Sequence, residues 1–279
     1  MKLPDLKKIY EKAQKGSYGI GAFNVYNLET AQAVAEAARD LQSPVIFQIT
    51  PKAIMYAGLN SIFEIVLSEI EEKKIEAAIH LDHALDFGIV KKCIDIGFNS
   101  VMIDGSTLPY LSNVALAEKV VNYAKAENVC VEAELGKISR GEGGKLSGMG
   151  EFTDPKLIPE FIEKTGLDSL AVSIGNEHGA PKGEKINLKL LSDIVEVSKK
   201  PIVLHGSSGL SRHDIKAAIE CGAVKFNIDT KIKQAFKAGL IENIKTEDPR
   251  EILTEVKMDI VKLVKDYIKI FGSENKADV

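Results

Sequence analysis

Cysteine pairs, long apolar runs and an excess of charge are all absent from this sequence. Its three cysteines, Cys93, Cys130 and Cys221, lie far apart and form no C-x-x-C pair, which argues against a disulfide framework or a thiolate metal site. No apolar run approaches the roughly 20 residues needed to cross a bilayer. The N-terminus also lacks the apolar segment and cleavage site of a signal peptide. We therefore expect a soluble, cytoplasmic protein without a membrane partner.

The charge balance and the length exclude further classes. Acidic and basic residues are mixed throughout, and the net charge is −4, so the sequence offers no basic surface for nucleic acid. A small molecule is the expected partner. No linker or change of composition divides the 279 residues, 45% of which are hydrophobic. We expect one domain spanning residues 1–279.

Short apolar, β-branched runs recur along the chain and predict strands. The eight runs are residues 19–25, 44–50, 76–82, 99–104, 129–134, 169–174, 201–205 and 223–229. Stretches with helical spacing, such as residues 28–41 and 87–96, lie between them. This alternation predicts an α/β fold with a parallel sheet, and eight repeats favour a closed (β/α)8 TIM barrel. An open, doubly wound sheet is the alternative.

Two segments stand outside the repeat. Residues 137–151 contain five glycines and few apolar residues, so we expect a mobile loop that is either a lid or a plain excursion. The last segment carries an apolar stripe on one long helix, which packs either on its own barrel or on a partner subunit. The stripe consists of Ile252, Val256, Ile260, Leu263, Val264 and Ile268.

Polar residues gather at the carboxyl ends of the predicted strands. They are Asn24, Thr50, Asp82, His83, Asp104, Glu134, His178, His205, Asn227 and Asp229. In a barrel these ends share one face, which is where barrel enzymes carry their active sites. The pattern therefore predicts a catalytic face.

Three of the five histidines belong to this set. His83, His178 and His205 are 95 and 27 residues apart and can converge only through the fold. Three imidazoles leave a fourth position open on a tetrahedral zinc ion, as in catalytic sites. His80 precedes Asp82 by two residues, so we expect it inside the barrel in a structural role. His213 follows a helix-capping Ser211 and should face solvent.

Two segments are suited to bind phosphate. HGSSGLS at residues 205–211 combines small residues, hydroxyls and a helix start, and NIDT at residues 227–230 follows the eighth strand. Loops after strands seven and eight of barrel enzymes are a habitual phosphate site.

The motifs now form a recognisable set. HLDHA at residues 80–84, VEAELG at 131–136, SLAVSIGNEHG at 169–179, VLHGSSGL at 203–210 and KFNIDT at 225–230 resemble the class II, metal-dependent fructose-bisphosphate and tagatose-bisphosphate aldolases. The order and spacing match over nearly the whole chain. The resemblance implies a lyase of glycolysis or related carbohydrate metabolism that cleaves a ketose bisphosphate reversibly to dihydroxyacetone phosphate and glyceraldehyde 3-phosphate. It also implies a homodimer or homotetramer.

The resemblance assigns roles to residues. His83, His178 and His205 would hold the catalytic Zn2+, and Asp104 and Glu134 match a second, alternative divalent-metal position. Asp82 would exchange the proton of the C4 hydroxyl. A monovalent cation near the phosphate is a further family feature. The predicted substrate-binding residues are Thr50, Gly179, Gly206, Ser207, Ser208, Asn227, Ile228, Asp229 and Thr230.

Three positions depart from the family pattern. The loop after VEAELG carries a single acid, Glu142, where relatives have an adjacent pair, so Glu142 is our candidate for acid/base chemistry at C3. Lys257 stands where bisphosphate aldolases often have an Arg for the distal phosphate, and the two side chains bind phosphate differently. Thr50 replaces the Ser of fructose-specific relatives and favours the tagatose branch.

Other functions remain open at this stage. A metal-dependent sugar-phosphate isomerase or epimerase could use the same histidines, and the substrate could be another ketose 1-phosphate. A non-catalytic aldolase-like subunit would need neither Asp82 nor the metal ligands. A Schiff-base aldolase would need a buried lysine at a strand end, whereas Lys225 begins the eighth strand, far from the expected active face.

Overall fold

Eight parallel strands close into a barrel. The computed structural model describes residues 3–142, 145–147, 150–179 and 185–278, with only the backbone of 139–142 and 145–147. The barrel strands, in chain order, are β1 (Ile20–Asn24), β2 (Val45–Ile49), β3 (Ala77–Ala84), β4 (Ser100–Ile103), β5 (Cys130–Leu135), β8 (Ser169–Val172), β10 (Ile202–Leu204) and β11 (Ala223–Ile228). Because β1 pairs with both β2 and β11, the sheet has no edge. The predicted (β/α)8 TIM barrel is confirmed, and the open sheet is excluded.

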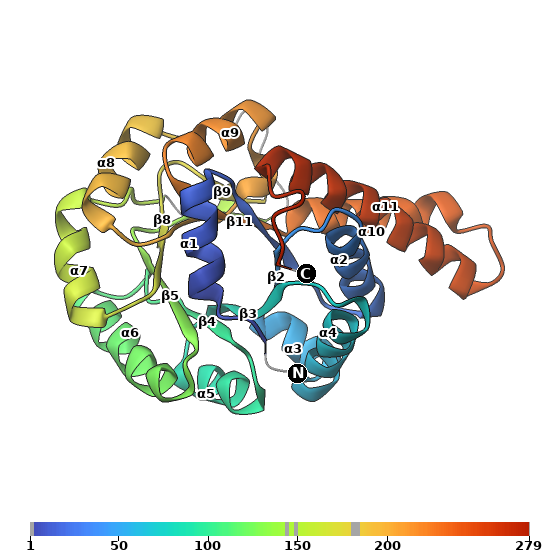
Figure 1. Ribbon diagram of the computed structural model, residues 1–279, viewed down its shortest axis with the longest axis horizontal. Helices are drawn as coiled ribbons and strands as arrows, with labels where there is room; N and C mark the ends of the chain where they lie inside the picture. The colour runs from blue at the N-terminus through green and yellow to red at the C-terminus, as the bar shows by residue number, and fades with distance from the viewer. Residues whose placement is uncertain (1–2, 143–144, 148–149, 180–184, 279) are drawn as a thin grey trace.

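Helices surround this barrel, and the first of them along the chain lies across its end (Figure 1). They are α1 (Leu6–Gly16), α2 (Leu28–Asp40), α3 (Pro51–Ala57), α4 (Leu59–Lys73), α5 (Phe87–Ile96), α6 (Tyr110–Ala124), α7 (Ile158–Thr165), α8 (Leu188–Ser198), α9 (Arg212–Glu220), α10 (Thr230–Asn243) and α11 (Pro249–Phe271). No single described helix is both long and apolar enough to span a bilayer. Only α3 and α4 taken together would be, and the chain bends by 98° between them.

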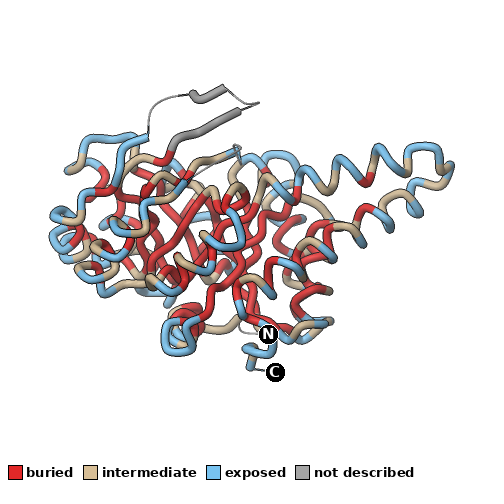
Figure 2. The backbone as a smooth tube through the Cα atoms, turned by 90° about the horizontal axis from the view of Figure 1, so that it is seen from above, coloured by how far each residue is buried: buried red, intermediate tan, exposed pale blue. Residues whose placement is uncertain are grey.

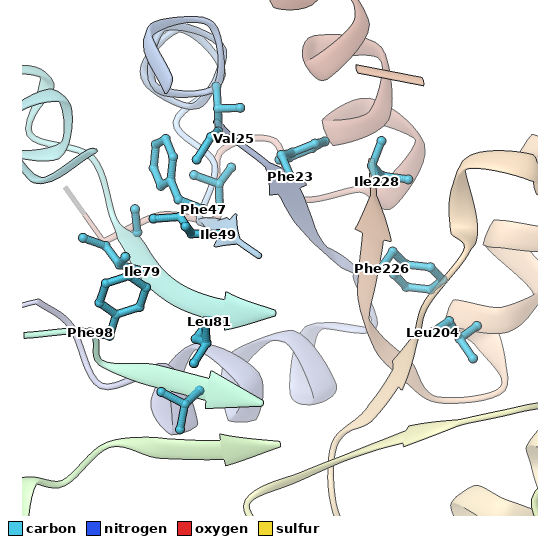
Figure 3. Packing of buried hydrophobic residues seen from close by; sticks show 14 of the residues in the cluster. Phe23, Val25, Phe47, Ile49, Ile79, Leu81, Phe98, Leu204, Phe226 and Ile228 are labelled. Carbon is cyan, nitrogen blue, oxygen red and sulfur yellow. The ribbon is translucent and has the colours of Figure 1, made fainter. Parts of the chain in front are cut away.

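The main hydrophobic core lies between the strands and the surrounding helices. Figure 3 shows Phe47, Ile79 and Leu81 among the side chains of this layer, and all three are fully buried. Successive strand residues point to opposite faces of the sheet. The strand residues that alternate with these helix-facing side chains therefore face the barrel interior. Figure 2 shows that buried residues are concentrated in the middle of the molecule, and Figures 1 and 2 show that α10 and α11 extend to one side.

Helix α1 closes the amino-terminal end of the barrel. Its Leu6, Ile9 and Tyr10 are buried in one cluster with the inward-facing Ile46 and Ala78 near the strand starts. The carboxyl terminus lies at the same end, because Asp278 pairs with Lys12 of α1 and its backbone N–H donates to Glu76, just before β3. The opposite end is therefore the one left for a binding site.

The apolar stripe of the last helix packs on its own chain. Val256, Ile260, Val264 and Ile268 of α11 are fully buried in the main core, and α11 lies against α2 and α10. Ile252 and Leu263 are partly buried beside them. The stripe therefore packs on its own barrel, the first of the two alternatives expected from the sequence.

The segment after β5 contains regular structure that its composition did not predict. Lys137 pairs with Glu151, and β6 (Ser139–Glu142) and β7 (Lys145–Ser147) form an antiparallel pair. β6 also pairs in parallel with β9 (Glu177–His178). The mobility expected for residues 137–151 stays a prediction, and the side chain of Glu142 lies outside the part that the structure describes.

Candidate active site

A cavity of about 500 Å³ opens at the carboxyl ends of the barrel strands. Most of the predicted site residues line it. These are Asn24, Thr50, Asp82, His83, His178, Gly179, His205, Gly206, Ser208, Asn227, Asp229 and Thr230. They come from strands far apart in the sequence, so closure of the barrel is what assembles the cavity.

Consecutive residues Asp82 and His83 both reach this cavity, which a regular strand would not allow. His83 has a left-handed backbone conformation with a φ of 51°, and the pairing of β3 with β4 shifts register between Leu81 and Ala84. Non-glycine residues rarely adopt such a φ, and they do so mainly where the surrounding structure imposes it. The irregularity therefore turns both polar side chains toward one site.

The three predicted metal ligands converge. The ring centroid of His83 lies 4.6 Å from that of His205 and 5.0 Å from that of His178. His83 Nε2 and His205 Nδ1 are only 2.9 Å apart, and one nitrogen of each of the three rings lies within 4.8 Å of the others. Zinc–nitrogen bonds of about 2.0–2.1 Å suit such a spacing, so the three imidazoles fit a zinc ion.

Carboxylates hold the other nitrogens of two of these rings. Asp104 Oδ2 lies 2.9 Å from His83 Nδ1, and Glu132 Oε1 lies 2.8 Å from His205 Nε2. Histidines that bind metals usually donate their second N–H in this way, which fixes the ring orientation. His83, Asp104 and Glu134 also form a second group of candidate ligand atoms within 4.8 Å of one another.

The charges of the site are strongly coupled. Burial would raise the pKa of Asp82, but the positive field of His83 and of other basic groups nearby outweighs it and lowers the pKa to about 2. Burial would likewise lower the pKa of His83, whereas the charges of Asp82 and Asp104 raise it to about 9. Burial and repulsion from Asp104 raise the pKa of Glu134 to about 8. Such a concentration of acids favours a cation.

The two predicted phosphate loops meet at the rim of the cavity. Gly206 has a φ of 68°, and a Cβ atom there would lie 2.3 Å from the carbonyl oxygen of Glu177. The position therefore requires glycine. Ser208 Oγ accepts a hydrogen bond of 3.2 Å from the backbone N–H of Asp229 and so ties the loop after β10 to the end of β11.

A few predicted residues have other contacts. The Ser207 hydroxyl donates to the carbonyl of Leu204 over 2.8 Å, and the Ile228 side chain packs in the main core. Neither residue is among those that line the cavity. Thr50 caps α3 by accepting from the N–H of Ala53. Lys257 pairs with Glu36 at 3.9 Å and does not line the cavity.

Two pairs of charged residues at the site were not predicted from the sequence. Lys52 and Lys233 line the cavity. Glu132 and Lys225 form a fully buried ion pair beneath it, so Lys225 lies closer to the site than its place in the strand suggested. Alternation could have found this pair, because Glu132 is two residues before Glu134 and Lys225 is two before Asn227.

Comparison with known proteins places the chain among aldolases. The family model described as fructose-bisphosphate aldolase class-II matches residues 4–276. The chain is 38% identical to a fructose-bisphosphate aldolase of Staphylococcus aureus, over 99% of this chain and 100% of that protein. The crystal structure of the YdjI aldolase from Escherichia coli K12 matches with a TM-score of 0.89 and 31% identity, covering 99% of this chain and 100% of that one.

A structure described as a putative fructose-1,6-biphosphate aldolase from Coccidioides immitis gives a TM-score of 0.90 at 28% identity, covering 98% of this chain and 97% of that one. The likeness therefore extends over the whole barrel and is not limited to the motifs at the strand ends.

His80 generates a prediction about pH. It is fully buried inside the barrel, as expected, and its Nδ1 lies 2.7 Å from Ser100 Oγ. Burial and the nearby Lys225 lower its pKa to about 3. An unfolded histidine titrates near pH 6.5, so the unfolded state binds an extra proton below that pH and the folded state loses stability as the pH falls toward 3.

The free energy of unfolding of the wild type, relative to His80→Gln, should therefore fall by about 2 kcal/mol between pH 8 and pH 5. Urea denaturation of both chelator-treated proteins measures this difference. Parallel pH profiles would show that His80 is not buried in its neutral form.

Proposed function

The chain belongs to the class-II fructose-bisphosphate aldolase family, a family of lyases, and we propose that it is a zinc-dependent ketose-bisphosphate aldolase. The proposed reaction is the reversible cleavage of fructose 1,6-bisphosphate or tagatose 1,6-bisphosphate to dihydroxyacetone phosphate and glyceraldehyde 3-phosphate. The observation that carries this proposal is the convergence of His83, His178 and His205 beside Asp82 in one cavity.

His83, His178 and His205 would hold the zinc ion. Bound there, zinc would supply Lewis-acid polarisation of the ketose carbonyl, which favours cleavage of the adjacent C3–C4 bond. His83, Asp104 and Glu134 offer a second position for a divalent ion. A monovalent cation near the phosphate remains part of the proposal on the family resemblance alone.

Asp82 would act as the base for the C4 hydroxyl. Its Oδ2 accepts a hydrogen bond of 3.1 Å from Asn24 Nδ2. The Oδ1 of Asn24 in turn accepts a hydrogen bond of 2.9 Å from Gln48 Nε2. These bonds hold the carboxylate in place at the cavity wall. Its lowered pKa keeps it ionised at neutral pH, ready to take the hydroxyl proton during cleavage and to return it during synthesis.

The glycine-rich loops would hold the phosphate of the ketone half. Gly179, Gly206 and Ser208 line the cavity together with Asn227, Asp229 and Thr230. Small residues let backbone N–H groups approach an oxyanion closely. Lys52 and Lys233 add positive charge to the same cavity.

The first test is metal-dependent cleavage. Zinc content and release of dihydroxyacetone phosphate should be measured on purified protein with each of the two bisphosphates, with and without EDTA. We expect bound zinc, cleavage that EDTA abolishes and zinc restores, and a ratio of rates that identifies the preferred epimer. Zinc binding without cleavage of either sugar would instead favour another ketose 1-phosphate or an isomerase.

Single substitutions should separate metal binding from proton transfer. His205→Ala should lose zinc and activity together, because it removes a ligand. Asp82→Asn should retain zinc and lose at least about 100-fold in turnover, the usual effect of removing a general base. His213→Ala is the matched control, since His213 is exposed on α9, and it should keep both. Full turnover in Asp82→Asn would refute the role of Asp82.

We also propose that Glu142 exchanges the proton at C3 of the substrate. Glu142→Ala should lower turnover by about 100-fold or more while zinc content stays at the wild-type level. Glu151→Ala provides the control, because this exposed residue belongs to the same segment and pairs with Lys137 only through its backbone. Equal activity of the two variants would mean that the acid at C3 lies elsewhere.

A further inference from the structure

A chain of buried polar side chains runs from the proposed metal site into the barrel. His205 Nε2 lies 2.8 Å from Glu132 Oε1, and Glu132 Oε2 lies 2.8 Å from Lys225 Nζ. Lys225 Nζ is 3.3 Å from His80 Nε2, and His80 Nδ1 is 2.7 Å from Ser100 Oγ. All five residues are at most 1% exposed. The proposed reaction uses His205 alone among them.

The donors and acceptors in this chain determine where the proton of His205 lies. The ammonium of Lys225 can only donate, and the ionised carboxylate of Glu132 can only accept. Glu132 Oε2 accepts from Lys225, so the contact between Oε1 and His205 Nε2 requires a hydrogen on Nε2. The neutral His205 ring then has its lone pair on Nδ1, the nitrogen that lies 2.9 Å from His83 Nε2.

We propose that the ion pair of Glu132 and Lys225 is a positioning device for His205. It places the ring proton on Nε2 and presents Nδ1 to the metal, so that zinc affinity depends on two residues that touch neither metal nor substrate. This inference rests on the proposed function, because it requires a metal ion at the three histidines.

The makeup of the barrel interior supports a positioning role. Neighbouring inward positions hold Met102, Ala171 and Val203, a fully buried apolar cluster, so an apolar filling of this layer is available to the fold. A buried ion pair is often no more stabilising than well-packed apolar residues of similar volume. The charged pair is therefore better explained by what it does for His205 than by stability.

Lys225 acts through Glu132 in this arrangement. A buried carboxylate without a charge partner or hydrogen bonds is strongly disfavoured. The ammonium of Lys225, 2.8 Å from Oε2, supplies the partner charge and leaves Oε1 to accept from His205 Nε2.

The double variant Glu132→Leu/Lys225→Met removes the acceptor of the His205 Nε2 hydrogen without leaving one buried charge unpaired. Its zinc dissociation constant, measured by competition with a chelating dye, should rise by about 10- to 100-fold, the usual effect of losing such a partner. Ser100→Ala is the matched control, because Ser100 belongs to the same buried chain but does not contact His205. Its zinc affinity should equal that of the wild type.

Urea denaturation of the metal-free proteins establishes that the variants fold. A folded double variant with wild-type zinc affinity would overturn the proposal. If the wild type itself bound no zinc, the proposed function would fail first, which separates the two conclusions.

Long-range 1H–15N spectra of the histidine rings in the wild type provide a second test that needs no folded variant at position 132. The His205→Gln spectrum identifies the His205 signals. We expect the proton on Nε2 in the metal-free protein and a coordination shift of Nδ1 when zinc is added. A proton on Nδ1, or coordination through Nε2, would contradict the inference.

Discussion

The two-residue alternation of the strands in a closed barrel is the constraint on which this structure depends. One face of each strand packs against helices and is apolar, as Phe47, Ile79 and Leu81 illustrate. In a closed barrel, the side chains on the other face of each strand point into the barrel interior. Along β3, the inward residues Ala78, His80 and Asp82 lead from the end closed by α1 to the cavity. Polarity therefore increases along the barrel axis, and the reactive groups lie where the strands end.

The sequence predicted most of this arrangement because its signals were local. The strand runs and the polar residues after them gave the barrel and its active face. The predicted metal ligands His83 and His205 could be placed because a barrel has only one carboxyl-terminal face. The strand-end position of Asp82 was likewise sufficient to bring it into the cavity.

What the sequence did not reveal depends on side-chain reach and on pairing between distant segments. Lys225 is only the third residue of β11, yet its long side chain extends along the interior to Glu132. Lys257, by contrast, lies on α11 and pairs with Glu36 away from the cavity. The glycine-rich composition of residues 137–151 gave no sign of strand pairing. The partner of β6 is β9, which lies more than 30 residues later and could not be recognised from local sequence. The φ of His83 and the register shift between β3 and β4 have no signature in the neighbouring sequence.

The position of the chain ends has a practical consequence. α1 covers one mouth of the barrel, and Asp278 is tied to Lys12 and Glu76 at that same end. Figure 2 shows both ends of the chain on one side of the molecule. A surface or a fused protein attached through either end would therefore lie at the end of the barrel opposite the cavity. The molecule could then be immobilised with the cavity facing outward. Attachment of this kind would not obstruct the entry of a small sugar phosphate.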